Sequence, residues 1–160
     1  MPVPEVATSL SWLHEQKITE AEIALEFARG APLLAATFAR ERDLSAIGNI
    51  REQWRQFLMA EKSPAALAAE TANVLDTRES LTLFMQWTTD LVKNVEFSLA
   101  DGRSSSEGAL TERKFLSQAL QLLQQSLRFD NASLKTLAVL EGVLADIRIQ
   151  RIRTRAENSA

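Results

Sequence analysis

The feature that most constrains the fold of this 160-residue chain is that its apolar residues recur with a helical period. Ile47, Ile50, Trp54, Phe57 and Leu58 follow one another at steps of three, four, three and one. Such spacing gathers apolar side chains on one face of an α-helix, whereas a half-buried strand requires strict alternation. No segment alternates in that way, tyrosine is absent, and glycine and proline number only five and four. The sequence therefore predicts an all-α fold.

Capping and turn residues divide the chain into eight expected helices. Thr19 and Glu22 have the spacing of a capping box, and Gly30 followed by Pro32 ends one helix and begins the next. The Ser- and Gly-rich stretch 101–108 is the clearest expected loop. The expected helices cover about 6–16, 19–29, 32–42, 43–58, 64–75, 77–99 and 111–127, and the last opens at Asp130 or Asn131.

The natural division of the chain falls near Arg40 to Asp43. Three short helices precede it, and longer, more apolar helices follow it. The sequence therefore predicts a three-helix unit over 1–42 and a larger helical bundle over 43–160.

Composition excludes several classes of protein. The net charge of −3 gives no electrostatic footprint for wrapping nucleic acid, and the absence of cysteine excludes disulfides and thiolate sites. No apolar run approaches the roughly 18 residues of a membrane span. The first five residues have neither the basic nor the apolar region of a signal peptide. We therefore expect a soluble, cytoplasmic protein that does not contact membranes.

Residue patterns for catalysis or for holding a metal or a cofactor are missing. Neither G-x-x-x-x-G-K-[ST] nor G-x-G-x-x-G occurs, and His14 is the single histidine. His14 is expected at the surface near a helix end. Glu20, Glu22 and Glu26 lack the histidines of a bundle di-metal site, and acidic residues in a first helical turn favour the helix dipole. The sequence predicts no catalytic residue, no metal site and no cofactor.

Two further patterns each allow two interpretations. The segment Arg148–Arg155 carries four arginines, which indicate either a contact for nucleic acid or an acidic partner, or a solvated last turn with cations at the negative helix end. The second interpretation is favoured because the rest of the chain is acidic. Trp12, Trp54 and Trp87 could line a ligand pocket, but their helical spacing favours core or interface anchors.

The last two expected helices carry more apolar residues than one buried stripe requires. The surplus predicts a surface for binding a partner. The candidate interface residues are Leu116, Leu120, Leu123, Val139, Val143 and Ile147.

The segment from Trp12 to Ala36 resembles the helical lid that follows the nucleotide-binding core of AAA+ ATPases. More narrowly, it resembles the lid of the delta-prime subunits of the bacterial DNA polymerase III clamp loader. In such lids an arginine after the glycine touches the γ-phosphate of the nucleotide. Leu33 stands at that position here, so the region Gly30, Pro32 and Leu33 resembles a lid without nucleotide chemistry.

The resemblance continues in order along the chain. The segment around Trp54 is similar to the first helix of the family's carboxy-terminal collar domain, and 81–91 to its long central helix. Asn131 followed by 137–144 resembles its final helix. The family's amino-terminal domain has no counterpart in this sequence.

The resemblance implies a non-catalytic lid and collar that acts in DNA replication. Its partners would be the delta and gamma or tau clamp-loader subunits. The collar domains of these subunits would pack into a ring that loads the sliding clamp. The chain would contact DNA only indirectly, through the complex. An alternative from another class is the ligand-binding and dimerising helical domain of a transcription regulator. That alternative predicts a two-helix dimer seam and an internal cavity. An enzyme on a helical bundle is disfavoured by the missing site residues.

Overall fold

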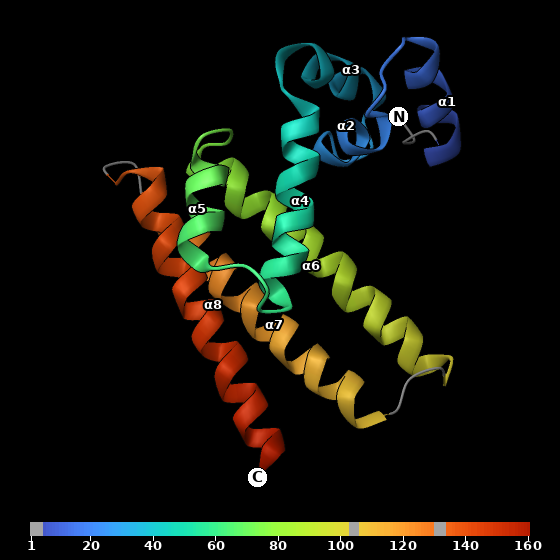
Figure 1. The fold of residues 1–160 in the computed structure, drawn as a ribbon. Coiled ribbons are helices and arrows are strands. Elements are labelled where there is room, and N and C mark those ends of the chain that lie inside the picture. Colours follow the sequence, from blue (N-terminus) through green and yellow to red (C-terminus); the bar gives the residue numbers. More distant parts are fainter. Residues whose placement is uncertain (1–4, 103–105, 130–133) are drawn as a thin grey trace. The chain divides into compact units, whose positions relative to one another are not determined.

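The computed structural model describes residues 5–102, 106–129 and 134–160, and within these ranges the chain forms eight helices and no strand (Figure 1). Helices account for 82% of the described residues, which confirms the predicted all-α class. Over the same ranges, none of the helices is both long and apolar enough to cross a membrane. The helices are α1 (Val6–Glu15), α2 (Ala21–Phe27), α3 (Pro32–Glu41), α4 (Leu44–Leu58), α5 (Pro64–Ala72), α6 (Thr77–Ala100), α7 (Ser106–Arg128) and α8 (Thr136–Ser159).

The chain divides into two compact units, Met1–Ile50 and Arg51–Ala160. The boundary therefore lies inside α4, and not between α3 and α4 as the sequence predicted with its ranges 1–42 and 43–160. The physical reason is that the two halves of α4 serve different cores. Ile47 and Ile50 are buried in the first unit, whereas Trp54 and Phe57 are buried in the second.

The first unit packs α1, α2, α3 and the start of α4 around small and apolar residues. Leu13, Ala24 and Ala35 are completely buried. Phe27 and Phe38 meet edge to face, with their ring centroids 4.6 Å apart. This core holds α2 against α3 across a very short connection.

Gly30 makes that connection possible. Its φ of 83° lies in the left-handed region, which costs glycine no steric strain. Its N–H donates a hydrogen bond to the carbonyl of Leu25 at 2.8 Å, which closes the end of α2. Pro32 then occupies the first turn of α3. The predicted stop and start at Gly30 and Pro32 are confirmed.

The structure confirms one of the predicted N-terminal caps and contradicts another. Thr19 does not cap α2: this helix begins at Ala21, with Glu20 at its N-cap and no side-chain capping bond, so the predicted capping box is wrong. The φ of −100° and ψ of 45° at Glu20 do not have the extended geometry that a capping residue typically adopts. Ser63 caps α5 as predicted, accepting a hydrogen bond from the N–H of Ala66. A full capping box, which the sequence analysis missed, opens α6 at Asp76 and Glu79.

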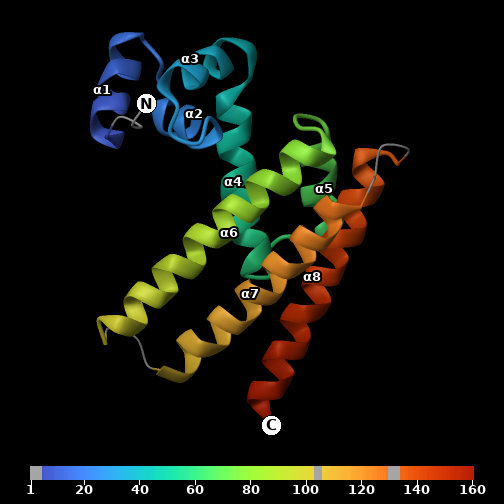
Figure 2. The same ribbon diagram turned by 180° about the vertical axis from the view of Figure 1, so that it is seen from behind.

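The second unit is built on three long helices that run alongside one another. Figures 1 and 2 show α6 and α7 as an antiparallel pair, with α8 antiparallel to α7 on its other side. Helix α5 packs against α8. Helix α4 contributes Trp54, whose ring stacks on Phe84 of α6 with centroids 4.3 Å apart. Trp54 also stacks on Phe57, and Phe84 contacts Trp87, so four aromatic rings form a continuous core.

Two helix starts in this unit differ from the sequence prediction. Helix α7 begins at Ser106, so the end of the expected loop 101–108 is helical. Helix α8 begins at Thr136, with Lys135 at its N-cap. The predicted caps Asp130 and Asn131 lie outside the described residues.

The capping box of α6 gives a stability prediction. Replacing Asp76 by alanine removes the acceptor that the N–H of Glu79 uses at 2.8 Å, and should lower the free energy of unfolding by about 0.5–2 kcal/mol. Asp76→Asn keeps an acceptor of equal capping strength and is the matched control. Urea denaturation followed by circular dichroism measures both variants, and equal loss in the two would contradict the assignment.

Candidate functional site: the inner and outer faces of helix α8

The residues that the sequence offered as a partner interface lie mostly in the core. Leu116 and Leu123 of α7 and Val143 and Ile147 of α8 are at most 5% exposed. Helix α7 packs against both α6 and α8, so its broad apolar stripe is filled within the bundle. For these four residues the interface prediction is wrong. Leu120 and Val139 are half-buried.

Exposed apolar residues of this unit also lie on the opposite side of α8, in addition to Met59, Phe97, Leu110, Phe129, Leu134 and Leu137 elsewhere in the unit. We call this surface the outer face. Ile149 and Ile152 at its centre are 46% and 61% exposed. Every residue of the outer face is exposed and uncharged, and the set consists of Ala138, Gly142, Ala145, Ile149, Ile152, Ala156 and Ser159.

The outer face of α8 differs from that of a solvated helix. Helix α7 exposes mainly polar and charged side chains to solvent: Glu107, Arg113, Lys114, Ser117, Gln121, Gln124, Gln125 and Arg128. The outer face of α8 has none of that charge over about 30 Å of helix. Its residues recur at alternating steps of four and three, which is the heptad spacing of a helix–helix seam. That spacing is the signal in the sequence that the earlier interface assignment missed.

Gly142 adds a second observation about this face. A Cβ built on Gly142 would meet no atom of the chain within 4 Å, so nothing in the chain itself requires a glycine there. Glycine in a helix interior is about 1 kcal/mol less favourable than alanine. A small residue on an open helix face is useful where another backbone approaches closely.

The inner and lateral sides of α8 hold its arginines against the bundle. The guanidinium of Arg148 lies over the ring of Phe57, 4.7 Å from its centroid, and donates a hydrogen bond to the carbonyl oxygen of Lys62. Burial lowers the pKa of Arg148 below its ordinary value, and the positive charges of Arg155 and Arg151 lower it further. Arg148 therefore fastens α8 to the segment that follows α4.

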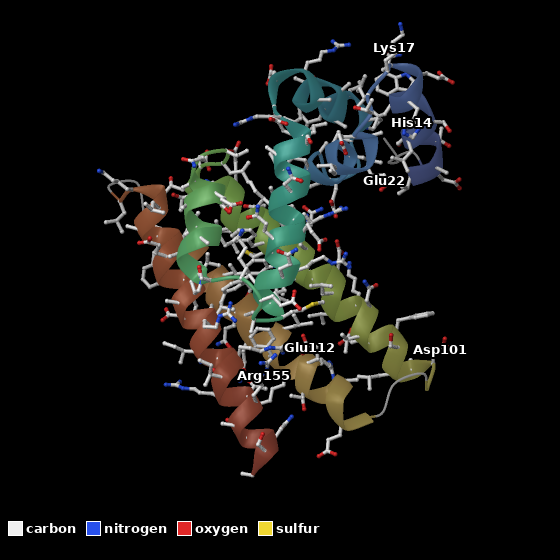
Figure 3. The ribbon with its side chains drawn as sticks, viewed as in Figure 1. His14, Lys17, Glu22, Asp101, Glu112 and Arg155 are labelled. Atoms are coloured by element: carbon white, nitrogen blue, oxygen red, sulfur yellow. The ribbon has the colours of Figure 1, made fainter. Side chains whose placement is uncertain are left out.

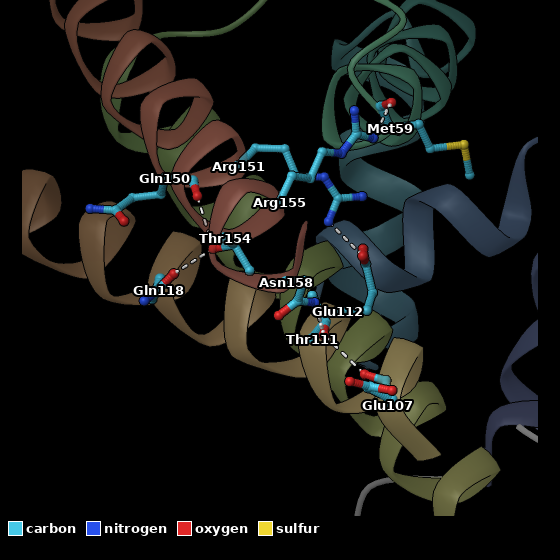
Figure 4. Close-up of polar contacts among 10 residues, drawn as sticks. All are labelled: Met59, Glu107, Thr111, Glu112, Gln118, Gln150, Arg151, Thr154, Arg155 and Asn158. Carbon is cyan, nitrogen blue, oxygen red and sulfur yellow. Dashed lines mark hydrogen bonds and ion pairs between the residues drawn. The ribbon is translucent and has the colours of Figure 1, made fainter. Parts of the chain in front are cut away.

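Arg151 and Arg155 also contact other parts of the bundle, Arg151 more closely than Arg155 (Figure 4). Arg151 lies 4.3 Å from the centroid of the Phe115 ring and pairs with the carboxylate of Glu112. Arg155 points to the carbonyl oxygen of Met59, at 3.5 Å. Figure 3 shows Glu112 on α7 and Arg155 on α8 in the same part of the bundle.

These contacts change the interpretation of the arginine cluster. Helix α8 continues to Ser159, so the arginines do not form its last turn, as the helix-end interpretation required. Met59 and Lys62 follow the end of α4, where a helix dipole is negative and favours cations. Arg148 and Arg151 are thus half-buried and bound within the chain, whereas Arg153 and Arg155 are exposed and Arg155 makes one long contact with Met59. The cluster serves mainly to join α8 to the end of α4 and to α7.

The other residues singled out in the sequence occupy separate places. Leu33 is 74% exposed in the first turn of α3, next to the half-exposed Leu34. His14 is exposed in the last turn of α1, as predicted. Trp54 and Trp87 are core residues, and Trp12 is half-buried.

The carboxylates do not form a site. Glu22 lies in the first turn of α2 and Glu20 at its N-cap. Among the described residues, no group of three His, Asp or Glu side chains could hold a metal ion.

Over the described residues, each unit has a hollow at its surface. The hollow of the second unit has a volume of about 490 Å³ and lies between Leu91 and Val95 of α6 and Gly108 and Glu112 of α7. The hollow of the first unit, about 580 Å³, is lined mainly by polar residues of the connection between α1 and α2 and of the segment from the end of α3 to the start of α4. None of the three tryptophans lines either hollow.

Comparison of the chain with family models, with curated proteins and with solved structures finds no match.

The role of Arg148 can be tested by stability. Arg148→Ala removes a charged hydrogen bond and a cation–π contact and should lower the free energy of unfolding by about 1.5–3 kcal/mol. Arg153→Ala, on the same helix but exposed, is the control, and at dilutions where the chain is monomeric it should change this free energy by less than about 0.5 kcal/mol. Urea denaturation measures both. Equal effects would show that Arg148 does not fasten α8.

Proposed function

We propose that this chain is the lid and collar part of a non-catalytic delta-prime-like clamp-loader subunit, which acts in DNA replication by assembling with neighbouring subunits. The resemblance in the sequence supplies the identity of the family. The observation that carries the assembly role is the outer face of α8. Under this proposal the delta and gamma or tau subunits are the partners, and DNA is met through the complex.

The outer face has the composition of a protein–protein interface. Its centre is apolar, with Ile149 and Ile152, while charged side chains such as Glu141, Asp146 and Arg153 flank it. Interfaces commonly combine an apolar core with a polar rim, and contiguous apolar patches mark binding surfaces. A helix that carries apolar residues on both sides fits a subunit that packs internally and externally at once.

We propose a non-catalytic subunit because of the residues at the turn that resembles a lid. By the resemblance, Leu33 stands where an active lid presents an arginine to phosphate. An exposed leucine supplies no positive charge and no hydrogen-bond donor from its side chain. The subunit would then be a rigid part of the ring, and nucleotide hydrolysis would belong to its neighbours.

The ligand-binding domain of a transcription regulator is the alternative. It requires a two-helix dimer seam and an internal cavity, with the tryptophans as candidate lining. Because Trp54 and Trp87 are instead core residues, we place the clamp-loader role first.

Nucleotide binding gives one test. Isothermal titration calorimetry of the purified chain with Mg·ATP should show no heat beyond dilution, because Leu33 cannot neutralise phosphate charge. Binding with a Kd of about 1 µM, which corresponds to about −8 kcal/mol, would contradict the non-catalytic role.

Subunit capture gives the more specific test. The chain should co-purify with the gamma and delta subunits of its own species when co-expressed with them. Ile149→Asp combined with Ile152→Asp should reduce capture at least about tenfold, since two buried carboxylates would be desolvated without partners.

Ser117→Asp combined with Gln121→Asp is the matched control. It adds the same charge to the exposed side of α7, at a spacing of four residues instead of three, and should leave capture and the helical circular dichroism signal unchanged. If the unsubstituted chain captures neither subunit, the clamp-loader role is wrong.

A further inference from the structure

We propose that, when no other subunit covers it, the outer face of α8 binds the same face of a second copy of this chain, with the two α8 helices antiparallel. This inference depends on the part of the proposed function that makes α8 an assembly surface. It does not depend on which heteromeric partners use that surface.

The order of side-chain sizes along the outer face is the first argument. From Gly142 to Ser159 the face shows two small residues, two isoleucines and two small residues: Gly142, Ala145, Ile149, Ile152, Ala156 and Ser159. This order is the same in both directions. An antiparallel second copy therefore pairs isoleucine with isoleucine at the centre and small residues with small residues at both ends.

The pairing defines a register. Ile149 lies opposite Ile152 of the second copy, Ala145 opposite its Ala156, and Gly142 opposite its Ser159. In this register, the residue numbers of two residues that lie opposite each other add up to 301. The small residues let the ends of the helices approach closely, which gives Gly142 a role that its own chain does not provide.

Charge is the second argument. Asp146 and Arg153 are exposed on the same flank of the outer face. A two-fold axis places this flank of one helix beside the same flank of the other. In the register above, Asp146 of each copy lies within about 3 Å, along the helix axis, of the level of Arg153 of the other. The dimer thus has two attractive pairs related by symmetry.

The charges on the other flank of the outer face do not repel each other strongly in this arrangement. Arg148 and Arg155 of different copies approach the same level there, but their guanidinium groups are turned to the carbonyl oxygens of Lys62 and Met59 of their own chain. A parallel pair is less favourable. It would put Glu141 beside Asp146 of the other copy, and like charges in these flanking positions disfavour a coiled-coil pairing.

Mass measurement gives the first test. Sedimentation equilibrium of the purified chain should show a concentration-dependent rise from 17.8 kDa toward twice that mass. Asp146→Arg or Arg153→Asp alone should weaken the dimer about tenfold or more, because each replaces two attractive pairs by two repulsive ones. The double variant, with both substitutions, should restore it. All three changes lie at exposed positions, and circular dichroism checks that helicity is retained.

Disulfide cross-linking tests the direction of the helices, since the chain has no cysteine of its own. Under oxidation, a mixture of Ala145→Cys and Ala156→Cys chains should form the mixed covalent dimer. Ala145→Cys alone should not cross-link, because its two copies would lie about 16 Å apart along the axis. Efficient cross-linking of Ala145→Cys alone would show a parallel pair and overturn the proposal.

The remaining outcomes separate this inference from the proposed function. A chain that stays at 17.8 kDa throughout but captures gamma and delta overturns the homodimer and leaves the clamp-loader role intact. A chain that dimerises with the expected charge and cross-linking pattern but captures neither subunit supports the homodimer and overturns the clamp-loader role.

Discussion

The stack of Trp54 on Phe84 is the interaction on which the second unit depends most. It fixes the end of α4 on α6, and Phe57 and Trp87 extend it into a continuous aromatic core. Phe57 in turn lies under the guanidinium of Arg148. One chain of ring contacts therefore connects α4 and α6 to α8, and it determines which side of α8 faces inward.

That orientation accounts for the two faces of α8. The inner side carries Leu140, Leu144 and Ile147 in the core, and Arg148 holds the helix to the segment after α4. The side opposite the core is left with Ile149 and Ile152 and with small residues. Exposed apolar area of this kind is unfavourable in water. A partner helix that covered it would remove this area from water and lower the free energy. The assembly role and the homodimer are both proposals about what covers it.

The fold class and most helices could be predicted from the sequence because helical periodicity and the residues that begin and end helices are features of neighbouring residues. Gly30 ends α2, Pro32 begins α3 and Ser63 caps α5, as predicted from their side chains. Periodicity does not say which of two apolar sides of a helix packs inward, so Val143 and Ile147 were assigned to an interface although they are core residues. The division inside α4 was missed for a related reason, since a continuous amphipathic stripe does not reveal that its two halves serve different cores. The roles of Arg148 and Arg151 depend on Lys62 and Glu112, which are distant in the sequence, and no local pattern contains that information.

The most direct test of the account is whether assembly covers Ile149. In an Ile149→Cys variant this position is the sole thiol, and the rate of its reaction with a maleimide can be measured with and without the gamma and delta subunits. Ser117→Cys, on the exposed side of α7, is the matched control. The account predicts that the subunits slow labelling at position 149 at least about tenfold and leave position 117 unchanged. Equal labelling at position 149 with the subunits bound and in the free chain, diluted until it has the monomer mass of 17.8 kDa, would contradict the claim that the outer face of α8 is an assembly surface.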